Sequence, residues 1–201
     1  MGLLTIIRKT RLKEKQVRVL MLGLDNAGKT TIVHKLLNKD VNKVSPTLGF
    51  SITTLVYKTF SLNIWDIGGQ STLRPYWRNY FETTDVVVWV VDSSDKARLR
   101  DTKQELENLL KQERLSGASL LVFANKQDIP GSLTAQQISE ALELDKLTSH
   151  KCHVEPCSAR TPSSSTTEQQ DPLWTGLDWV VSEMTQRRYY GTQNPWASPI
   201  A

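Results

Sequence analysis

Eight consecutive residues near the start of the chain have the types and spacing of a phosphate-binding loop. The segment Gly23-Leu24-Asp25-Asn26-Ala27-Gly28-Lys29-Thr30, here called the P-loop, satisfies G-x-x-x-x-G-K-[ST] between a strand-like and a helix-like run. Its glycines would let backbone N–H groups wrap around phosphates, and the N-terminus of the following helix would add positive potential. Lys29 would reach the outer phosphates, Thr30 would ligate Mg²⁺, and Thr31 follows as a further nucleotide contact. The P-loop predicts a bound nucleotide but not which base.

Two later segments could select the base. Asn125-Lys126-Gln127-Asp128 follows a strand-like run, at the edge where α/β sheets bind ligands. The Asp128 carboxylate could accept hydrogen bonds from guanine N1–H and the exocyclic amine, a pair that adenine does not offer. Cys157-Ser158-Ala159, at the end of the last strand-like run, would present backbone N–H groups to guanine O6. We therefore predict a GTP or GDP site, with Asn125, Lys126, Asp128, Ser158 and Ala159 on the base side.

A third segment, Trp65-Asp66-Ile67-Gly68-Gly69-Gln70, has groups suited to a metal ion and to hydrolysis. Asp66 sits where a carboxylate would hold Mg²⁺ through water, and Thr47 is a candidate second hydroxyl ligand, so the predicted metal set is Thr30, Thr47 and Asp66. Gly69 could bring its N–H against a γ-phosphate, and Gln70 could orient the attacking water as the catalytic residue. The alternative is a strand followed by a Gly-Gly turn in which Asp66 is only a cap. We call the segments around Thr47 and Gly69 the first and second switch segments.

The elements that must position these residues alternate along the chain. Expected strands are residues 17–22, 51–57, 60–66, 86–92, 119–125 and 152–157, and expected helices are 29–37, 96–114, 134–144 and 173–187. Near-continuous apolar runs such as 86–91 are typical of strands buried on both faces, hence of a parallel sheet covered by helices. Only Lys58 and Thr59 join the second and third strands, which must form an antiparallel hairpin. The predicted fold is α/β, with a six-stranded mixed, mostly parallel sheet flanked by helices.

Composition and charge narrow the function classes. The 201 residues are 39% hydrophobic and 23% charged, as in an ordinary globular domain, and no apolar run approaches the roughly 20 residues that span a bilayer. Residues 8–18 hold six basic side chains and one acid, so the net charge of +4 belongs to this arm and the remainder is near −1. The arm could lie on an anionic membrane, or it could be a solvated helix docked on its own domain. Without a second basic patch, no nucleic-acid partner is expected.

The chain divides into three expected regions. Residues 1–15 would be an N-terminal amphipathic helix and basic arm, 16–188 the nucleotide-binding domain, and 189–201 a flexible tail. Within the domain, residues 160–172 contain no large apolar side chain and are expected to form a disordered loop insertion. Cys152 and Cys157 lie at odd spacing in one expected strand, so they would face opposite sides of the sheet as reduced thiols.

Together these motifs resemble the Arf/Arf-like family of small GTPases from Gly2 to about Arg188. The family-specific features are G-L-D-N-A-G-K-T-T, S-P-T-L-G-F, W-D-I-G-G-Q, R-P-Y-W-R-N-Y-F and A-N-K-Q-D. The resemblance implies the P-loop small-GTPase fold, GTP/GDP and Mg²⁺ as ligands, and a cytoplasmic location, with association with the cytoskeleton left open. It also implies a role in tubulin folding and microtubule assembly with tubulin-folding cofactors, and binding to carrier proteins for lipidated cargo.

The resemblance further implies a switch mechanism. In this family, residues matching Phe50, Trp65 and Tyr80 form an aromatic cluster between the switch segments, although residue type alone would favour three ordinary core aromatics. The hairpin that carries two of them shifts register, and a slip of about two residues keeps each side chain on its face. The N-terminal segment is similar to the family's movable helix. The myristoylation pattern M-G-x-x-x-[ST] fails at Ile6, so weak or no membrane binding is expected.

Two function hypotheses of different classes follow. The first is a monomeric GTPase switch that hydrolyses GTP slowly, needs a GTPase-activating protein, and binds effectors in the GTP state. The sequence offers no candidate for a catalytic arginine within the chain, and it gives no reason for Asp25 beside the phosphates. The second hypothesis is an interaction module that binds guanine nucleotide without hydrolysing it. Gln70 discriminates between them, because such a module has no need for a group that orients water.

Overall fold

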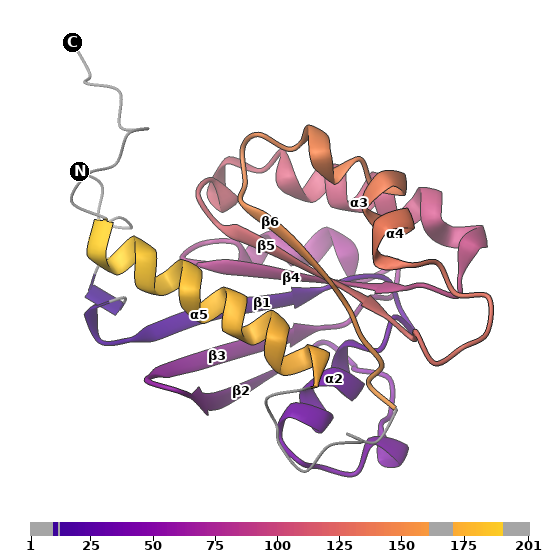
Figure 1. Ribbon diagram of the computed structural model, residues 1–201, viewed down its shortest axis with the longest axis horizontal. Helices are drawn as coiled ribbons and strands as arrows, with labels where there is room; N and C mark the ends of the chain where they lie inside the picture. The colour runs from indigo at the N-terminus through magenta and orange to yellow at the C-terminus, as the bar shows by residue number, and fades with distance from the viewer. Residues whose placement is uncertain (1–9, 12, 161–170, 191–201) are drawn as a thin grey trace.

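The structure, a computed structural model, describes residues 10, 11, 13–160 and 171–190. Residues 1–9 and 12 of the predicted N-terminal helix and arm, residues 161–170 of the predicted insertion and residues 191–201 of the predicted tail lie outside the described residues. The remainder is an α/β domain with one sheet between two layers of helices (Figure 1).

The sheet has the predicted number of strands and the predicted directions. Its strands are β1 (Gln16–Leu22), β2 (Phe50–Tyr57), β3 (Phe60–Ile67), β4 (Val86–Asp92), β5 (Ser119–Asn125) and β6 (Cys152–Pro156). Their order is β2-β3-β1-β4-β5-β6, with β2 antiparallel to β3 and every other pair parallel. Strand β5 is buried along its whole length, as its apolar run predicts. The predicted fold class is confirmed.

Four α-helices cover the two faces of this sheet. They are α2 (Lys29–Leu36), α3 (Leu99–Leu110), α4 (Ala135–Ala141) and α5 (Pro172–Tyr190). Apolar side chains of α2 and α5 share one core with alternate residues of β1, including Val17, Val19 and Met21. Side chains of α3 and α4 pack in a second core with the intervening residues Leu20 and Leu22. The period of two along β1 therefore decides which helices each side chain meets.

Several predicted boundaries were wrong for local reasons. The predicted helix 96–114 is split into short 3₁₀ turns at Lys96–Arg98 and Glu113–Leu115 around α3. The predicted helix 134–144 stops at Ala141, and Glu143 has a left-handed backbone with φ of 54°. Cys152 and Cys157 do face opposite cores, and both are free thiols.

The end of the predicted insertion also needs correction. Asp171 and Pro172 belong to the start of α5 rather than to a disordered loop, because the Asp171 carboxylate accepts the Leu173 N–H at 3.0 Å. Proline suits the first helical turn because its missing N–H would have no partner there. Helix α5 then runs to Tyr190, three residues beyond the predicted end of the helix and two residues into the predicted tail.

Candidate functional site

The P-loop connects the end of β1 to the start of α2, as its pattern predicts. At Gly23 an added Cβ would lie 2.3 Å from the carbonyl oxygen of Val90, so only glycine lets the loop leave the sheet here. Gly28 has a φ of 95°, the left-handed conformation that glycine adopts without strain, immediately before α2 begins at Lys29. The backbone N–H groups at this helix start are therefore available to an anion.

Lys29 is the charged group at the centre of the loop. Its side chain is buried, and its Nζ donates to the carbonyl oxygens of Gly23 at 3.0 Å and Leu24 at 2.9 Å. Burial lowers the pKa of Lys29 to about 8, while the nearby Asp66 and Asp25 carboxylates act in the opposite direction. A phosphate beside this ammonium would restore its favoured charged form. The environment of Lys29 therefore fits a bound phosphate.

The three predicted metal ligands converge at one point. Thr30 Oγ1 lies 2.6 Å from Thr47 Oγ1 and donates to Asp66 Oδ2 at 2.7 Å, and Thr47 Oγ1 lies 3.3 Å from the same oxygen. The other carboxylate oxygen, Oδ1, is buried without a hydrogen-bond partner, and burial raises the pKa of Asp66. Two hydroxyls and a carboxylate with an unused oxygen are donors that Mg²⁺ accepts when phosphates and water complete its shell. The residues fit the ion.

Within the described chain, the metal site predicted at Asp66 is not built from a cluster of carboxylates, imidazoles or thiols. Among residues 13–160 and 171–190, no group of three or more His, Cys, Asp or Glu side chains could hold a metal ion. Besides Asp66, a magnesium ion there would be held by the hydroxyls of Thr30 and Thr47 and by phosphate and water oxygens.

The second switch segment lies directly against the P-loop. A Cβ built on Gly69 would be 2.4 Å from Leu24 C and 2.5 Å from Asp25 N, closer than real Cβ atoms come. The adjacent Gly68 is fixed from both sides, because its N–H donates to Gly49 O at 2.8 Å and its carbonyl accepts from Trp77 Nε1 at 3.0 Å. Gln70 follows at the surface, with an exposed side chain. The segment is held in place while Gln70 stays accessible.

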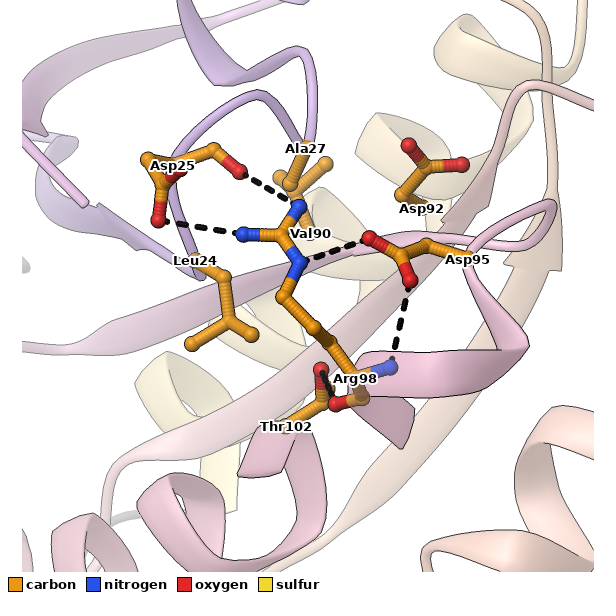
Figure 2. A pocket seen from close by; sticks show the side chains of 8 residues that line it. All are labelled: Leu24, Asp25, Ala27, Val90, Asp92, Asp95, Arg98 and Thr102. Carbon is orange, nitrogen blue, oxygen red and sulfur yellow. Dashed lines mark hydrogen bonds and ion pairs between the residues drawn. The ribbon is translucent and has the colours of Figure 1, made fainter. Parts of the chain in front are cut away.

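Two arginines beside the P-loop were missed by sequence reasoning. Arg98 donates to Asp25 Oδ1 at 3.2 Å and to the Asp25 carbonyl at 3.3 Å, and its Nε is 2.6 Å from Asp95 Oδ2 (Figure 2). Arg74 lies 3.5 Å from the same Asp25 oxygen, bonds Glu105 at 3.0 Å, and donates through Nε to Gly69 O at 3.1 Å. Asp25 thus joins the P-loop to α3 and to the second switch segment, which supplies the reason that the sequence lacked.

These arginines also bear on the expectation that the chain has no catalytic arginine. Both are close to the phosphate end of the site, but each is paired with carboxylates. Arg74 opens the R-P-Y-W-R-N-Y-F motif, but no motif placed either arginine beside Asp25, because both are far from it in sequence and meet it only through the fold.

The base-side residues meet at the ends of β5 and β6. Asn125 donates through Nδ2 to Ala27 O at 2.8 Å, and its Oδ1 accepts the Ala159 N–H at 3.1 Å. Ser158 Oγ donates to Asp128 Oδ1 at 2.5 Å. Asn125 therefore links the two loops to each other, and the Ala159 N–H is committed to that link. That the backbone amides of both Ser158 and Ala159 serve guanine stays a prediction.

The base-side loop is held in shape by contacts of the predicted residue Lys126 and by residues outside the predicted set. Lys126 Nζ lies 2.6 Å from Asp92 Oδ2, and its backbone has a left-handed φ of 66°. Gln127 Nε2 donates to Leu133 O at 2.9 Å and to Ser93 Oγ at 3.0 Å. The position of Gln127 inside N-K-Q-D was the only sequence signal for this role.

The predicted aromatic cluster is assembled in the structure. The ring centroids of Phe50, Trp65 and Tyr80 are 5.4 to 5.9 Å apart in all three pairs. The Arg18 guanidinium lies 4.1 Å from the Trp65 ring centroid, a cation–π contact. Arg11 bonds Thr83 O at 2.5 Å and lies 3.5 Å from Asp85. Arg18 lies in β1 and is part of the domain, whereas Arg11 contacts the domain from the arm, which favours the docked alternative at this residue.

Within the described ranges, no helix has the length and apolar character needed to cross a bilayer.

The chain is similar to known proteins over most of its length. Residues 3–184 match the ADP-ribosylation factor (Arf) family. "ADP-ribosylation factor-like protein 2" of Dictyostelium discoideum is 54% identical over 187 residues, covering 93% of this chain and 97% of that protein. The protein of the same name from Arabidopsis thaliana is 54% identical over 190 residues, covering 94% and 98%. The structure of the Arl6 BBS3 small GTPase from Trypanosoma brucei with bound GppNp matches with a TM-score of 0.74 and 29% identity, over 85% of this chain and 98% of that one.

Proposed function

Because the chain belongs to the ADP-ribosylation factor family of small GTPases, we propose that it is a GTP/GDP switch that hydrolyses GTP slowly and binds effectors while GTP is bound. The observation that carries this proposal is the convergence of both switch segments on the P-loop. Thr47 reaches the hydroxyl of Thr30, and Gly69 packs on the backbone of Leu24 and Asp25. A γ-phosphate placed beside Lys29 would touch both segments, so its loss would release both.

The chain's own groups divide the work of hydrolysis. Lys29 would hold the outer phosphates, and the Gly69 N–H would donate to the γ-phosphate. Gln70 would orient the attacking water from the exposed side of the site. Mg²⁺, held by Thr30, Thr47 and Asp66, would neutralise charge on the phosphates. The base would be fixed by Asp128 and the Ser158 loop.

The proposal of slow intrinsic hydrolysis follows from two features of the same site. The Gln70 side chain is exposed, so nothing in the described chain holds it in one orientation. The nearby Arg74 and Arg98 are paired with carboxylates instead of facing the phosphates. Related enzymes without a catalytic arginine turn over at roughly 10⁻⁴ s⁻¹, and an added arginine is worth about 10³ to 10⁵ in rate. A GTPase-activating partner would supply the missing catalytic arginine.

A single-turnover hydrolysis assay tests this function against the non-hydrolysing alternative. GTP-loaded protein should release phosphate slowly, and Gln70→Leu should bind GTP normally but hydrolyse it at least about tenfold more slowly, because only the orientation of water is lost. Gln112→Leu is a matched control, since it removes an exposed glutamine at the end of α3, away from the P-loop. Equal rates for wild type and Gln70→Leu, with an activating extract present, would favour the non-hydrolysing module.

The resemblance to Arf-like proteins extends the proposal to partners and location. We propose that the GTP form acts with tubulin-folding cofactors in microtubule assembly and binds carriers of lipidated cargo. The similarity over more than 90% of the chain to proteins named ADP-ribosylation factor-like protein 2 supports this branch of the family. We also propose a cytoplasmic monomer with weak or no membrane binding. A pull-down with GTP- and GDP-loaded protein, together with cell fractionation, tests these points. Partners that bind both forms equally would contradict an effector role.

A further inference from the structure

Lys35 on α2 points from the phosphate half of the site toward the base half. Its Nζ donates to the carbonyl oxygen of Ser158 at 3.0 Å and forms an ion pair with Asp171 Oδ2 at 2.8 Å. The side chain of Lys35 is 16% exposed and that of Asp171 only 4%, so this pair is largely shielded from water. Figure 1 shows the start of α5 beside α2, in agreement with this ion pair. Neither residue belongs to a nucleotide-binding motif.

Asp171 has a second contact that fixes it independently of Lys35. Its Oδ1 accepts the N–H of Leu173 at 3.0 Å, at the start of α5. The helix is anchored in turn, since Leu173 and Leu177 are buried in the core shared with α2. Asp171 is therefore a rigid negative charge, and it holds the flexible Lys35 side chain in the direction of Ser158.

The group that Lys35 holds belongs to the base-binding loop. Ser158 Oγ bonds Asp128, the predicted guanine acceptor, and the next amide, Ala159 N–H, bonds Asn125. The Lys35 bond to Ser158 O is thus a third restraint on the same loop, from a different side. It comes from α2, the helix whose N-terminus carries Lys29 and Thr30. One helix therefore contacts both ends of the predicted nucleotide site.

The restraint is placed where this chain needs one. Residues 160–170 separate the base-binding loop from α5, so Ser158 and Asp171 are far apart along the chain but are bridged by a single ammonium group. The sequence of this stretch has no large apolar side chain, so another contact is needed to hold its two ends together. The ion pair with Asp171 and the bond to Ser158 supply that function.

We propose that Lys35 and Asp171 form a positioning clamp that holds the base-binding loop in its guanine-binding shape and thereby sets the residence time of the nucleotide. This inference rests on the proposed function, since it concerns GDP and GTP bound at that site. Lys35 touches neither base nor phosphate in this arrangement; it acts through the peptide of Ser158. Its effect should therefore appear in nucleotide dissociation and not in the hydrolytic step.

The measurement is dissociation of a fluorescent GDP analogue, chased with excess GDP at fixed Mg²⁺. Lys35→Met keeps the apolar stem and removes the charge, and should release GDP roughly tenfold faster, the effect of losing one hydrogen bond from a charged donor. Lys35→Arg retains a charged donor and should restore part of the residence time. Single-turnover GTP hydrolysis by Lys35→Met should stay near the wild-type rate. The matched control is Lys103→Met, which breaks the 2.8 Å Lys103–Glu143 ion pair on α3 and should release GDP at the wild-type rate.

A double variant separates positioning from stability. Lys35→Met removes the ammonium group that faces the buried Asp171 carboxylate, so it should also lower the melting temperature of nucleotide-free protein. Adding Asp171→Asn removes that charge and keeps an oxygen that can accept the Leu173 N–H. The Lys35→Met/Asp171→Asn protein should recover much of its melting temperature yet still release GDP quickly.

Two results would overturn the clamp. One is a wild-type dissociation rate for Lys35→Met. The other is a double variant that recovers melting temperature and residence time together, because that would make the role of the pair purely structural. A wild-type protein that binds no GDP would instead contradict the proposed function, so the two failures are distinguishable.

Discussion

Replacing Gly69 by alanine tests the closed arrangement of the second switch segment. The added Cβ would lie 2.4 Å from Leu24 C, 2.5 Å from Asp25 N and 2.5 Å from Gly23 O. All three are backbone atoms of the P-loop, which is fixed between β1 and α2. The backbone at residue 69 must therefore move away from the P-loop. Reaching even the 3.0 Å below which real Cβ contacts essentially never occur requires a shift of about 0.6 Å.

The shift should affect hydrolysis far more than binding. Gly69 bears the N–H expected to meet the γ-phosphate, and Gln70 follows it directly. A displacement near 1 Å in a catalytic arrangement costs roughly 10²-fold in rate. We therefore expect Gly69→Ala to lower single-turnover GTP hydrolysis by about one to two orders of magnitude. GDP affinity should remain near the wild-type value, because a diphosphate leaves the segment free to sit away from the P-loop.

A second glycine provides the control. Gly117→Ala places its Cβ in open space, with no atom within 4 Å, but its φ of 76° disfavours any side chain. It should cost about 1–2 kcal/mol of unfolding free energy and leave hydrolysis unchanged. The assays are phosphate release, fluorescent-nucleotide binding and urea unfolding on all three proteins. Hydrolysis by Gly69→Ala within about twofold of wild type would refute the closed arrangement.

Two further predictions concern base selection and pH. Asp128→Asn should reduce the affinity for GDP and raise the affinity for xanthosine diphosphate, because the amide donates where the carboxylate accepts. An unchanged preference for GDP over the xanthine and adenine nucleotides would remove Asp128 from the base site. Burial lowers the pKa of His150 below its ordinary 6.5, so the unfolded chain takes up this proton first as pH falls. Stability should therefore decrease from about pH 7 to about pH 5, and urea unfolding of His150→Gln should show a smaller decrease; an identical pH dependence would contradict this.

Much of the architecture was predictable because the signals are local. The run of Val and Trp in β4 reports burial on both faces, and the two-residue connection at Lys58 and Thr59 permits only a hairpin. The P-loop pattern specifies a strand, a turn with a left-handed Gly28 and a helix in one short segment. Such features depend on neighbouring residues, so one sequence suffices to identify them.

The unpredicted parts depend on contacts between residues distant in sequence. The pairing of Asp25 with Arg98 spans 73 positions, and that of Lys35 with the Ser158 carbonyl spans 123. The sequence around Asp25, Arg98 or Lys35 has no local pattern that distinguishes these side chains from solvated charges. The boundary at Asp171 failed for a related reason: an Asp-Pro pair ending a polar run is also a helix start, and only the buried core beyond it shows which applies.

The two ends of the candidate site are held by bonds of different kinds, and the difference suits a switch. On the base side, the buried Asn125 amide joins the P-loop to the Ser158 loop through bonds at 2.8 and 3.1 Å. On the phosphate side, the second switch segment is joined to the P-loop through Arg74 and an Asp25 side chain that is 46% exposed, across 3.5 Å. Exposed ion pairs contribute about 0–1 kcal/mol, whereas breaking a buried hydrogen bond costs about 1–3 kcal/mol. Loss of the γ-phosphate should therefore open the switch side while the base side keeps its hold on the nucleotide, which is the asymmetry that a GDP-bound resting state requires.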